Sequence, residues 1–166
     1  MLKKLVIAIM CCLPFTVMAQ TLKFGTVKTQ ELFAAMPETV QAESQLQEFT
    51  KRYEDEFLKL QEDFQKKFAE VQAMGDTVPE TIKMRRYEEL ETMQQRIESF
   101  QQVAQQDIVK KQQELMAPIQ QKLMQAIQEV GSENGFTYIF DAAQPVYIGT
   151  SSEDVTSLVK KKLGIQ

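Results

Sequence analysis

The chain has 166 residues, of which 43% are hydrophobic and 25% are charged, with 19 basic residues, 23 acidic residues and no histidine. Its net charge of −4 excludes a general nucleic-acid binder, because such a protein needs a basic surface to neutralise phosphates. The sequence offers no catalytic base paired with a nucleophile, no glycine-rich phosphate loop and no cluster of metal ligands. We therefore expect a protein that is not an enzyme and that needs no cofactor.

Residues 1–19 have the pattern of a secretory signal peptide. Lys3 and Lys4 precede an apolar run over 5–18, and Ala19 provides a small residue at the expected cleavage point. The run is too short to cross a membrane, and no later segment resembles a membrane span. We expect an exported, soluble chain that loses both of its cysteines with the signal. Removing two lysines leaves 17 basic residues against 23 acidic ones, a net charge of −6.

The first segment after the signal predicts short elements. Residues 22–27 alternate in polarity and predict a strand, and 29–35 predict a short helix that ends before Met36-Pro37.

Two long apolar stripes then predict an antiparallel helical hairpin over 38–115. The stripes have the three- and four-residue spacing of one helix face and mirror each other about a point between Asp76 and Thr77, so that partner positions sum to 153 or 154. Helix-compatible sequence covers 38–74 and 79–130, or roughly 55 and 75 Å at 1.5 Å per residue. An eleven-residue repeat predicts nearly straight or slightly right-handed pairing. The predicted hairpin seam consists of Phe49, Tyr53, Phe57, Leu60, Phe64, Leu90, Met93, Ile97 and Phe100.

The tip of the hairpin is expected near 75–79. Gly75 suits a helix C-terminal cap, and Thr77-Val78-Pro79-Glu80 fits a capping box. Between Lys66 and Arg86 the sequence has five basic and three acidic residues, a local charge of +2. This window is either ordinary solvated helix surface or a basic tip for an acidic partner or an anionic lipid head group.

The C-terminal segment predicts a small body together with 20–37. Gly131 and Gly135 end the second long helix, 136–140 and 146–148 predict strands, and Ser151 or Ser152 can cap a helix over 153–163. A body of roughly 60 residues has a marginal core of its own, and its apolar strands would be exposed. Both problems are solved if several copies share one sheet, so we expect an oligomer built on 20–37 and 116–166. The predicted oligomer core is Leu22, Phe24, Val27, Phe136, Tyr138, Phe140, Val146 and Ile148.

Pro118 lies inside the second long helix, where it is expected to produce a kink. The kink is either a tolerated bend or a hinge between the arm and the body.

The end segments resemble the Skp/OmpH-like family of periplasmic chaperones. The strongest similarity is Leu115-x-x-Pro118-Ile119-x-x-Lys122-x-x-x-Ala126-Ile127-x-x-Val130, followed by Gly135-Phe136-x-x-Ile139-Phe140-Asp141, Val146-Tyr147 and Asp154-Val155-Thr156. The start, Lys23-Phe24-Gly25-Thr26-Val27 leading to Leu32-Phe33, is also similar. The arm is similar in length and hairpin form but not in its residues.

The resemblance implies a jellyfish-like homotrimer of mostly helical α+β chains, with a β-barrel-like body and three arms around a cavity. It implies a periplasmic holdase that keeps unfolded outer-membrane proteins soluble without ATP. The best-known member of the family is strongly basic, whereas this chain is acidic, so anionic lipid or lipopolysaccharide could bind only at the basic tip. Apolar and basic side chains outside the seam are the candidate client contacts: Leu58, Met74, Val78, Met84, Tyr87, Lys83, Arg85 and Arg86. The alternative function is a structural or adaptor coiled coil of the cell envelope.

Overall fold

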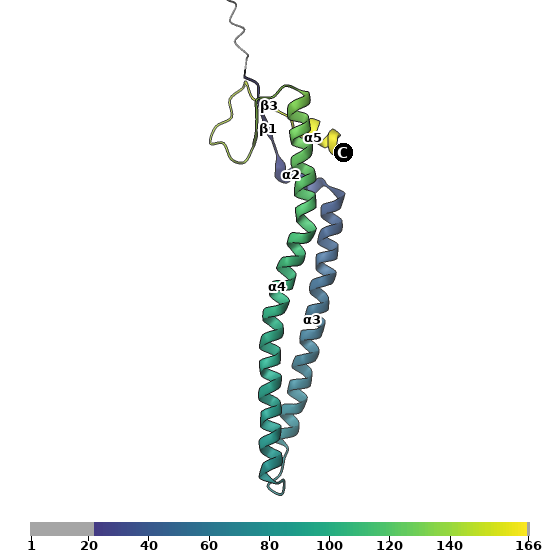
Figure 1. Ribbon diagram of the computed structural model, residues 1–166, viewed down its shortest axis with the longest axis vertical. Coiled ribbons are helices and arrows are strands. Elements are labelled where there is room, and N and C mark those ends of the chain that lie inside the picture. The colour runs from purple at the N-terminus through teal and green to yellow at the C-terminus, as the bar shows by residue number, and fades with distance from the viewer. Residues whose placement is uncertain (1–21, 166) are drawn as a thin grey trace, which may run out of the picture.

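The structure is a computed structural model that describes residues 22–165, so the predicted signal peptide over 1–19 lies outside the described residues. Figure 1 shows a body of short elements at one end and two long helices that project from it. In chain order the elements are β1 (Phe24–Val27), α2 (Thr29–Ala35), α3 (Pro37–Gln72), α4 (Glu80–Glu133), β2 (Tyr138–Asp141), β3 (Glu153–Asp154) and α5 (Thr156–Leu163). The fold is therefore α+β and mostly helical.

The arm consists of α3, with 36 residues, and most of α4, which has 54 residues. The two helices pack together along the length of α3, and the chain turns between them at 73–79 (Figure 1). The rings of Tyr53 and Phe100 lie 5.7 Å apart across the pair. These positions sum to 153, as the mirror pattern in the sequence predicts, so the helices run antiparallel in that register.

The body is built on a parallel three-stranded sheet with the order β2-β1-β3. In the register of the central strand, Phe24 lies beside Tyr138 and Thr26 lies beside Phe140. Gly25 is the residue between them, and a Cβ atom built there would lie 3.1 Å from the Phe136 ring. The sheet therefore needs glycine at this position to let Phe136 approach the strand.

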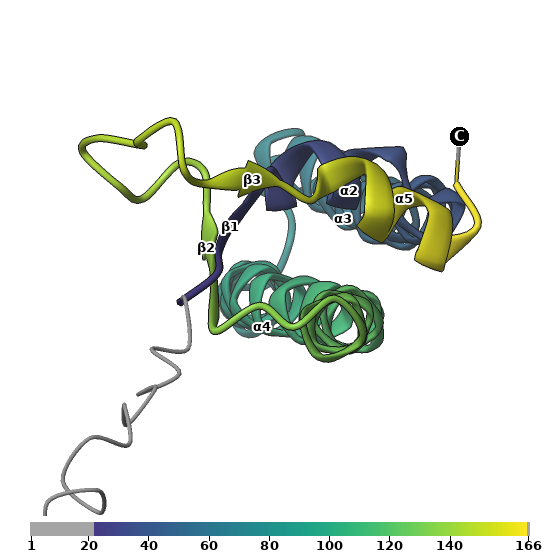
Figure 2. The same cartoon turned by 90° about the horizontal axis from the view of Figure 1, so that it is seen from above.

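One hydrophobic core joins the inner face of the sheet to α2, α5 and the last third of α4. Its largest fully buried side chains are Leu32, Met36, Val27, Val155 and Val159. The face that α4 contributes repeats at helical spacing and consists of Ile119, Leu123, Ala126, Ile127 and Val130. Figure 2 shows α2 and α5 on one side of the sheet and the end of α4 beside β2.

Pro118 lies within α4, and the helix continues beyond it to Glu133. The prediction that Gly131 ends this helix is wrong by one turn, because α4 includes Gly131 and stops before Gly135, which has a φ of +67°. Only glycine reaches that backbone conformation without a steric cost. Gly131 is needed for space instead, since its Cβ would lie 3.3 Å from Cδ1 of Ile139.

The predicted strand over 146–148 is wrong. The third strand is Glu153–Asp154, which pairs with Gly25 and Thr26 of β1. A strand needs a hydrogen-bonding partner, and residues 146–148 pair with none of the three strands of the sheet β2-β1-β3. Residues 142–152 form the connection between these two strands, and Val146, Tyr147 and Ile148 lie exposed on it.

The two predicted helix caps at the tip are wrong, and so is the predicted cap of the last helix. At the tip, Ala73 rather than Gly75 is the C-terminal cap of α3, in a right-handed helical conformation. The cap of α4 is Pro79, whose carbonyl accepts the amides of Ile82 and Lys83, so Thr77 forms no capping box. A residue that precedes proline avoids the helical region, which prevents the helix from starting at Val78.

The last helix, α5, starts at Thr156 with Val155 as its cap, not at 153 with Ser151 or Ser152. Residues 153–154 are extended because they pair with β1. The predicted basic last turn is present, with Lys160, Lys161 and Lys162.

Candidate functional site

The outer face of the sheet carries a row of stacked aromatic rings. Phe24 stacks on Tyr138 at a centroid distance of 6.1 Å with an interplanar angle of 10°, and Tyr138 stacks on Phe140 at 6.0 Å. Tyr138 is 57% exposed and Phe140 is 46% exposed. Successive residues of a strand point to opposite faces, so Ile139 faces the core while its two neighbours face outward.

The connection over 142–152 extends this apolar surface. Val146 and Tyr147 are almost wholly exposed, and Ile148 is also exposed. Tyr147 and Ile148 line a groove of about 440 Å³ together with Phe24 and Phe140. We call Phe24, Tyr138, Phe140, Val146, Tyr147 and Ile148 the outer sheet face. A contiguous exposed apolar patch of this kind is typical of an interaction surface.

The structure separates the eight residues of the predicted oligomer core. The outer sheet face contains Phe24, Tyr138, Phe140, Val146 and Ile148, and Leu22 is exposed just before β1. Val27 is buried in the core of the chain itself, and Phe136 packs against that core with the Lys23 ammonium 4.0 Å from its ring centroid. Sequence periodicity alone could not distinguish the two faces of such short strands.

The predicted seam residues lie between α3 and α4. Leu60 and Leu90 are buried, and the remaining seven are partly buried. Tyr53 also donates a hydrogen bond from its hydroxyl to Oδ2 of Asp107, at 2.7 Å. The hydrogen bond and the nearby carboxylate raise the pKa of Tyr53 above its usual value of 10.0. The sequence pattern does not indicate this role of Asp107, because a single acidic residue in a helix is usually exposed to solvent.

The candidate client contacts lie mainly at the far end of the arm. Met84, Tyr87 and Leu58 are exposed, with Leu58 farther from the tip, whereas Met74 and Val78 are partly buried. Thus the tip presents apolar side chains outside the seam.

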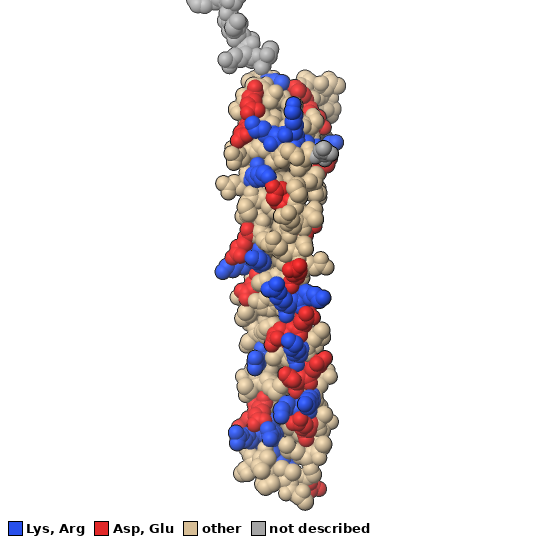
Figure 3. Space-filling view, turned by 90° about the vertical axis from the view of Figure 1, so that its right-hand side faces the viewer, with Lys and Arg blue, Asp and Glu red and all other residues tan. Residues whose placement is uncertain are grey.

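Three of the five basic residues of the tip are paired with acids. Arg86 lies 2.7 Å from Glu89, Arg85 lies 3.7 Å from the same carboxylate, and Lys67 lies 3.0 Å from Glu70. Hydrogen bonding to Arg86 lowers the pKa of Glu89. Lys83 is partly buried. Figure 3 shows blue and red side chains interleaved along the arm rather than a continuous basic patch.

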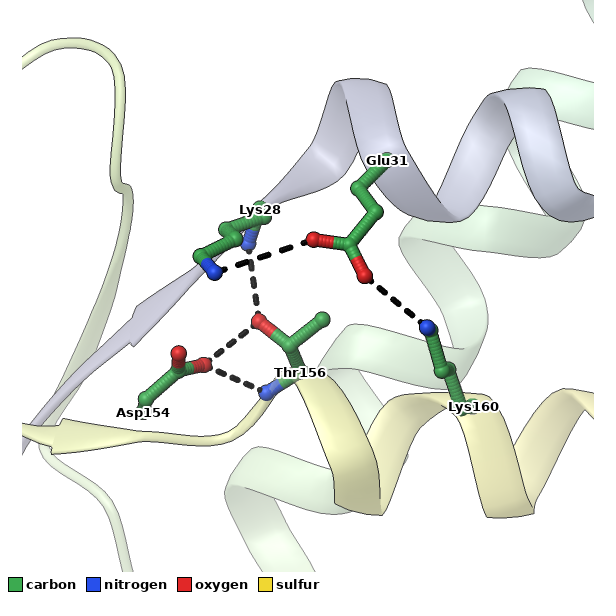
Figure 4. Close-up of polar contacts among 5 residues, drawn as sticks. All are labelled: Lys28, Glu31, Asp154, Thr156 and Lys160. Carbon is green, nitrogen blue, oxygen red and sulfur yellow. Dashed lines mark hydrogen bonds and ion pairs between the residues drawn. The ribbon is translucent and has the colours of Figure 1, made fainter. Parts of the chain in front are cut away.

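A polar network holds the body together where β1, α2 and α5 meet (Figure 4). Oδ1 of Asp154 accepts the backbone amide of Thr156 at 2.9 Å and also accepts its hydroxyl. The Thr156 hydroxyl in turn accepts the Lys28 amide at 3.1 Å. Glu31 pairs with Lys160 at 2.8 Å and with Lys28 at 3.7 Å.

The network lowers the pKa of Asp154, mainly through the hydrogen bonds from Thr156. It fixes the start of α5 against the end of β1, so we assign it a structural role. The spacing Asp154-x-Thr156 is the sequence signal that could have indicated it.

No helix within residues 22–165 is long and apolar enough to cross a membrane. The same residues contain no group of three or more acidic, cysteine or histidine side chains placed to bind a metal ion.

Comparisons with known proteins identify the family. A family model described as "Outer membrane protein (OmpH-like)" matches residues 23–163. A crystal structure of a candidate outer membrane chaperone (OmpH-like) from Caulobacter crescentus CB15 is similar in fold, with a TM-score of 0.75 and 13% sequence identity. The similarity covers 86% of this chain and 83% of that one. A search of curated proteins found no match. The family match spans nearly all of the described residues, and the chain therefore belongs to the OmpH/Skp-like family of non-enzymatic outer membrane chaperones.

Proposed function

We propose that this chain is an ATP-independent periplasmic holdase that binds unfolded outer-membrane proteins between the arms of a homotrimer. The observation that carries the proposal is the pairing of an exposed apolar sheet face with a long projecting arm in one chain. The sheet face provides a surface for assembly, and the arms provide a space that assembly would enclose.

The outer sheet face supports self-association. Tyr138 and Phe140 present stacked rings to water, and Val146 and Tyr147 extend the patch. Burying apolar surface contributes roughly 25 cal/mol per Å², so covering this patch would stabilise the small body. In this proposal residues 20–37 and 116–166 form the trimerisation body, and 38–115 form the arm.

The surface of the arm supports weak and adaptable client binding. Met84 and Tyr87 are exposed near the tip, and methionine adapts its shape to many partners. Three of the five basic residues of the tip pair with neighbouring acids, and the face drawn in Figure 3 shows no continuous basic surface on the arm. We propose that apolar contacts make the larger contribution to client binding, and that anionic lipid or lipopolysaccharide could contact the arm only at the basic tip.

The proposal is tested by diluting a urea-unfolded β-barrel membrane protein into buffer with the chain and without ATP, and following light scattering. Suppressed aggregation supports the holdase. No suppression at several-fold excess contradicts it and favours an adaptor with a folded partner at the tip. Running the assay at low and high salt identifies the contacts, since loss of suppression at high salt would assign capture to the bases of the tip.

Assembly is tested with a matched pair of exposed tyrosines. Tyr138 is 57% exposed on the sheet face, and Tyr87 is 60% exposed near the tip. Tyr138→Lys is expected to reduce the native mass to that of a monomer, whereas Tyr87→Lys is expected to keep the mass of the assembly. Equal masses for the two variants would contradict assembly through the sheet face.

A further inference from the structure

One side of α4 carries no charge over the segment where the arm joins the body. Between positions 105 and 124 the helix has five charged residues, Asp107, Lys110, Lys111, Glu114 and Lys122. None of them is among six residues that recur every three or four positions: Gln105, Val109, Gln113, Met116, Gln120 and Met124. Helical geometry places these six within an arc of about 100°, with all five charges outside it. We call the six residues the uncharged stripe.

Five of the six residues of the stripe are exposed. Val109 and Met124 are both 52% exposed, the three glutamines are exposed, and Met116 is partly buried. Gln105, Val109 and Gln113 line a shallow groove on the arm, which Lys110 borders. Gln120 and Met124 line a second groove, of about 530 Å³, whose other wall includes Phe33 and Ile139. The two grooves follow one another along α4.

The glutamine amides of the stripe are free to bind a partner. Elsewhere on α4 the amides of Gln94 and Gln125 donate to Glu98 and Glu129. Within residues 22–165, the side-chain amides of Gln105, Gln113 and Gln120 form no hydrogen bond with another side chain or with the backbone. An amide side chain offers two donors and one acceptor, so it can pair with the N–H or C=O of any extended backbone.

We infer that the uncharged stripe of α4 binds extended, unfolded segments of the client, an inference that rests on the proposed holdase function. The free amides pair with the backbone of the client, and the exposed Val109 and Met124 contact its apolar side chains. Strands of membrane barrels alternate apolar and polar side chains, which suits a surface that alternates glutamine with valine and methionine. Among the described residues that line the two grooves, Lys110 and Asp141 are charged and have opposite signs, so the surface does not favour client segments of one charge.

The location of the stripe fits this role. Figures 1 and 2 both place the sheet and the 142–152 connection on one side of α4. The groove at the body end of the stripe reaches Ile139 and Asp141 of β2, which lie on the face of the strand opposite to Tyr138 and Phe140. Assembly through the outer sheet face would leave this groove uncovered, because the groove lies on the other face of β2, so the stripe would stay accessible to a client.

Val103 and Val109 provide a matched test. They have the same side chain and nearly equal exposure, 51% and 52%, but Val103 lies among the charged residues and outside the stripe. In the aggregation assay the Val109→Glu variant is expected to suppress scattering about fivefold less effectively than the unchanged chain. The reason is that the substitution places a charge against the apolar side chains of the client. Val103→Glu is expected to behave like the unchanged chain. Circular dichroism and native mass must be the same for both variants.

A second measurement replaces each valine in turn with a photo-crosslinking amino acid and adds an unfolded β-barrel membrane protein. Crosslinks to the client from position 109, with several-fold fewer from position 103, would support the inference. If the two positions gave equal effects or equal crosslinking in a chain that still suppresses aggregation, the proposed binding role of the stripe would be wrong. The holdase function would not be contradicted by that result. Crosslinks from 109 to another copy of the chain without client would also overturn the proposed binding role. A chain with no suppression at all would contradict the holdase itself.

Discussion

Tyr53 and Asp107 join the two helices of the arm by a hydrogen bond of 2.7 Å between residues 54 positions apart in the sequence. It lies in a seam made otherwise of apolar side chains, beside the contact between Tyr53 and Phe100. A polar pair in such a seam favours the one register in which both groups are satisfied, because any sliding of the helices leaves them unpaired.

Tyr53→Phe is therefore expected to destabilise the arm by about 1 kcal/mol, the usual net contribution of one hydrogen bond. Urea unfolding followed by circular dichroism measures this loss. Asp107→Asn in the same background should cost little more, since the two side chains act as a pair. Full additivity of the two substitutions would show that the contact contributes nothing to stability.

The pKa of Asp154 is lowered in the folded chain by the hydrogen bonds from Thr156. A carboxyl group whose pKa is lower in the folded chain than in the unfolded chain stabilises the fold at pH values above its unfolded pKa, which is 3.8 here. This stabilisation is lost as the pH falls through the folded pKa. We expect the body to lose stability below about pH 4. Asp154→Asn should make this acid dependence shallower in thermal melts between pH 2 and 5. An unchanged acid profile would mean that other carboxylates dominate it.

Gly25→Ala is expected to destabilise the body by about 1–3 kcal/mol, because the added methyl group must displace the Phe136 ring and Ile139. Gly149→Ala serves as the control, since its nearest neighbour would lie 3.7 Å away and its φ is not positive. Thermal melts of the two variants measure the difference. If both were equally stable, Phe136 must be able to move without cost.

Pro118 interrupts the hydrogen-bond ladder of α4 where the arm joins the body. Pro118→Ala should stabilise the chain by about 2 kcal/mol, because the restored bond exceeds the entropy gained by the unfolded chain. Distances between spin labels on the body and the tip separate the two interpretations. A hinge predicts a narrower distribution in the variant, whereas a tolerated bend predicts a shifted distribution of unchanged width.

Much of the fold could be predicted from the sequence because helical spacing dominates it. The buried positions Leu60 and Leu90 belong to stripes long enough to define both the hairpin and its register. The element over 29–35 could be predicted to the residue, since Pro37 limits it.

The body could be predicted less well because its strands are only two to four residues long. Val146, Tyr147 and Ile148 have strand propensity but no partner, whereas Glu153 and Asp154 lack that propensity and pair with β1 because the connection brings them there. In both segments the availability of a pairing partner in the folded chain, and not the local strand propensity, determines whether a strand forms. The burial of Val27 likewise depends on which face of β1 meets α4, which a four-residue pattern does not specify.

The measurement that tests the central claim most directly is the native mass of the chain with and without an unfolded β-barrel membrane protein, by light scattering after size-exclusion chromatography in the absence of ATP. We predict a trimer alone and a soluble, heavier complex of the trimer with the client. A monomer that forms no complex, while the client precipitates, would contradict the account.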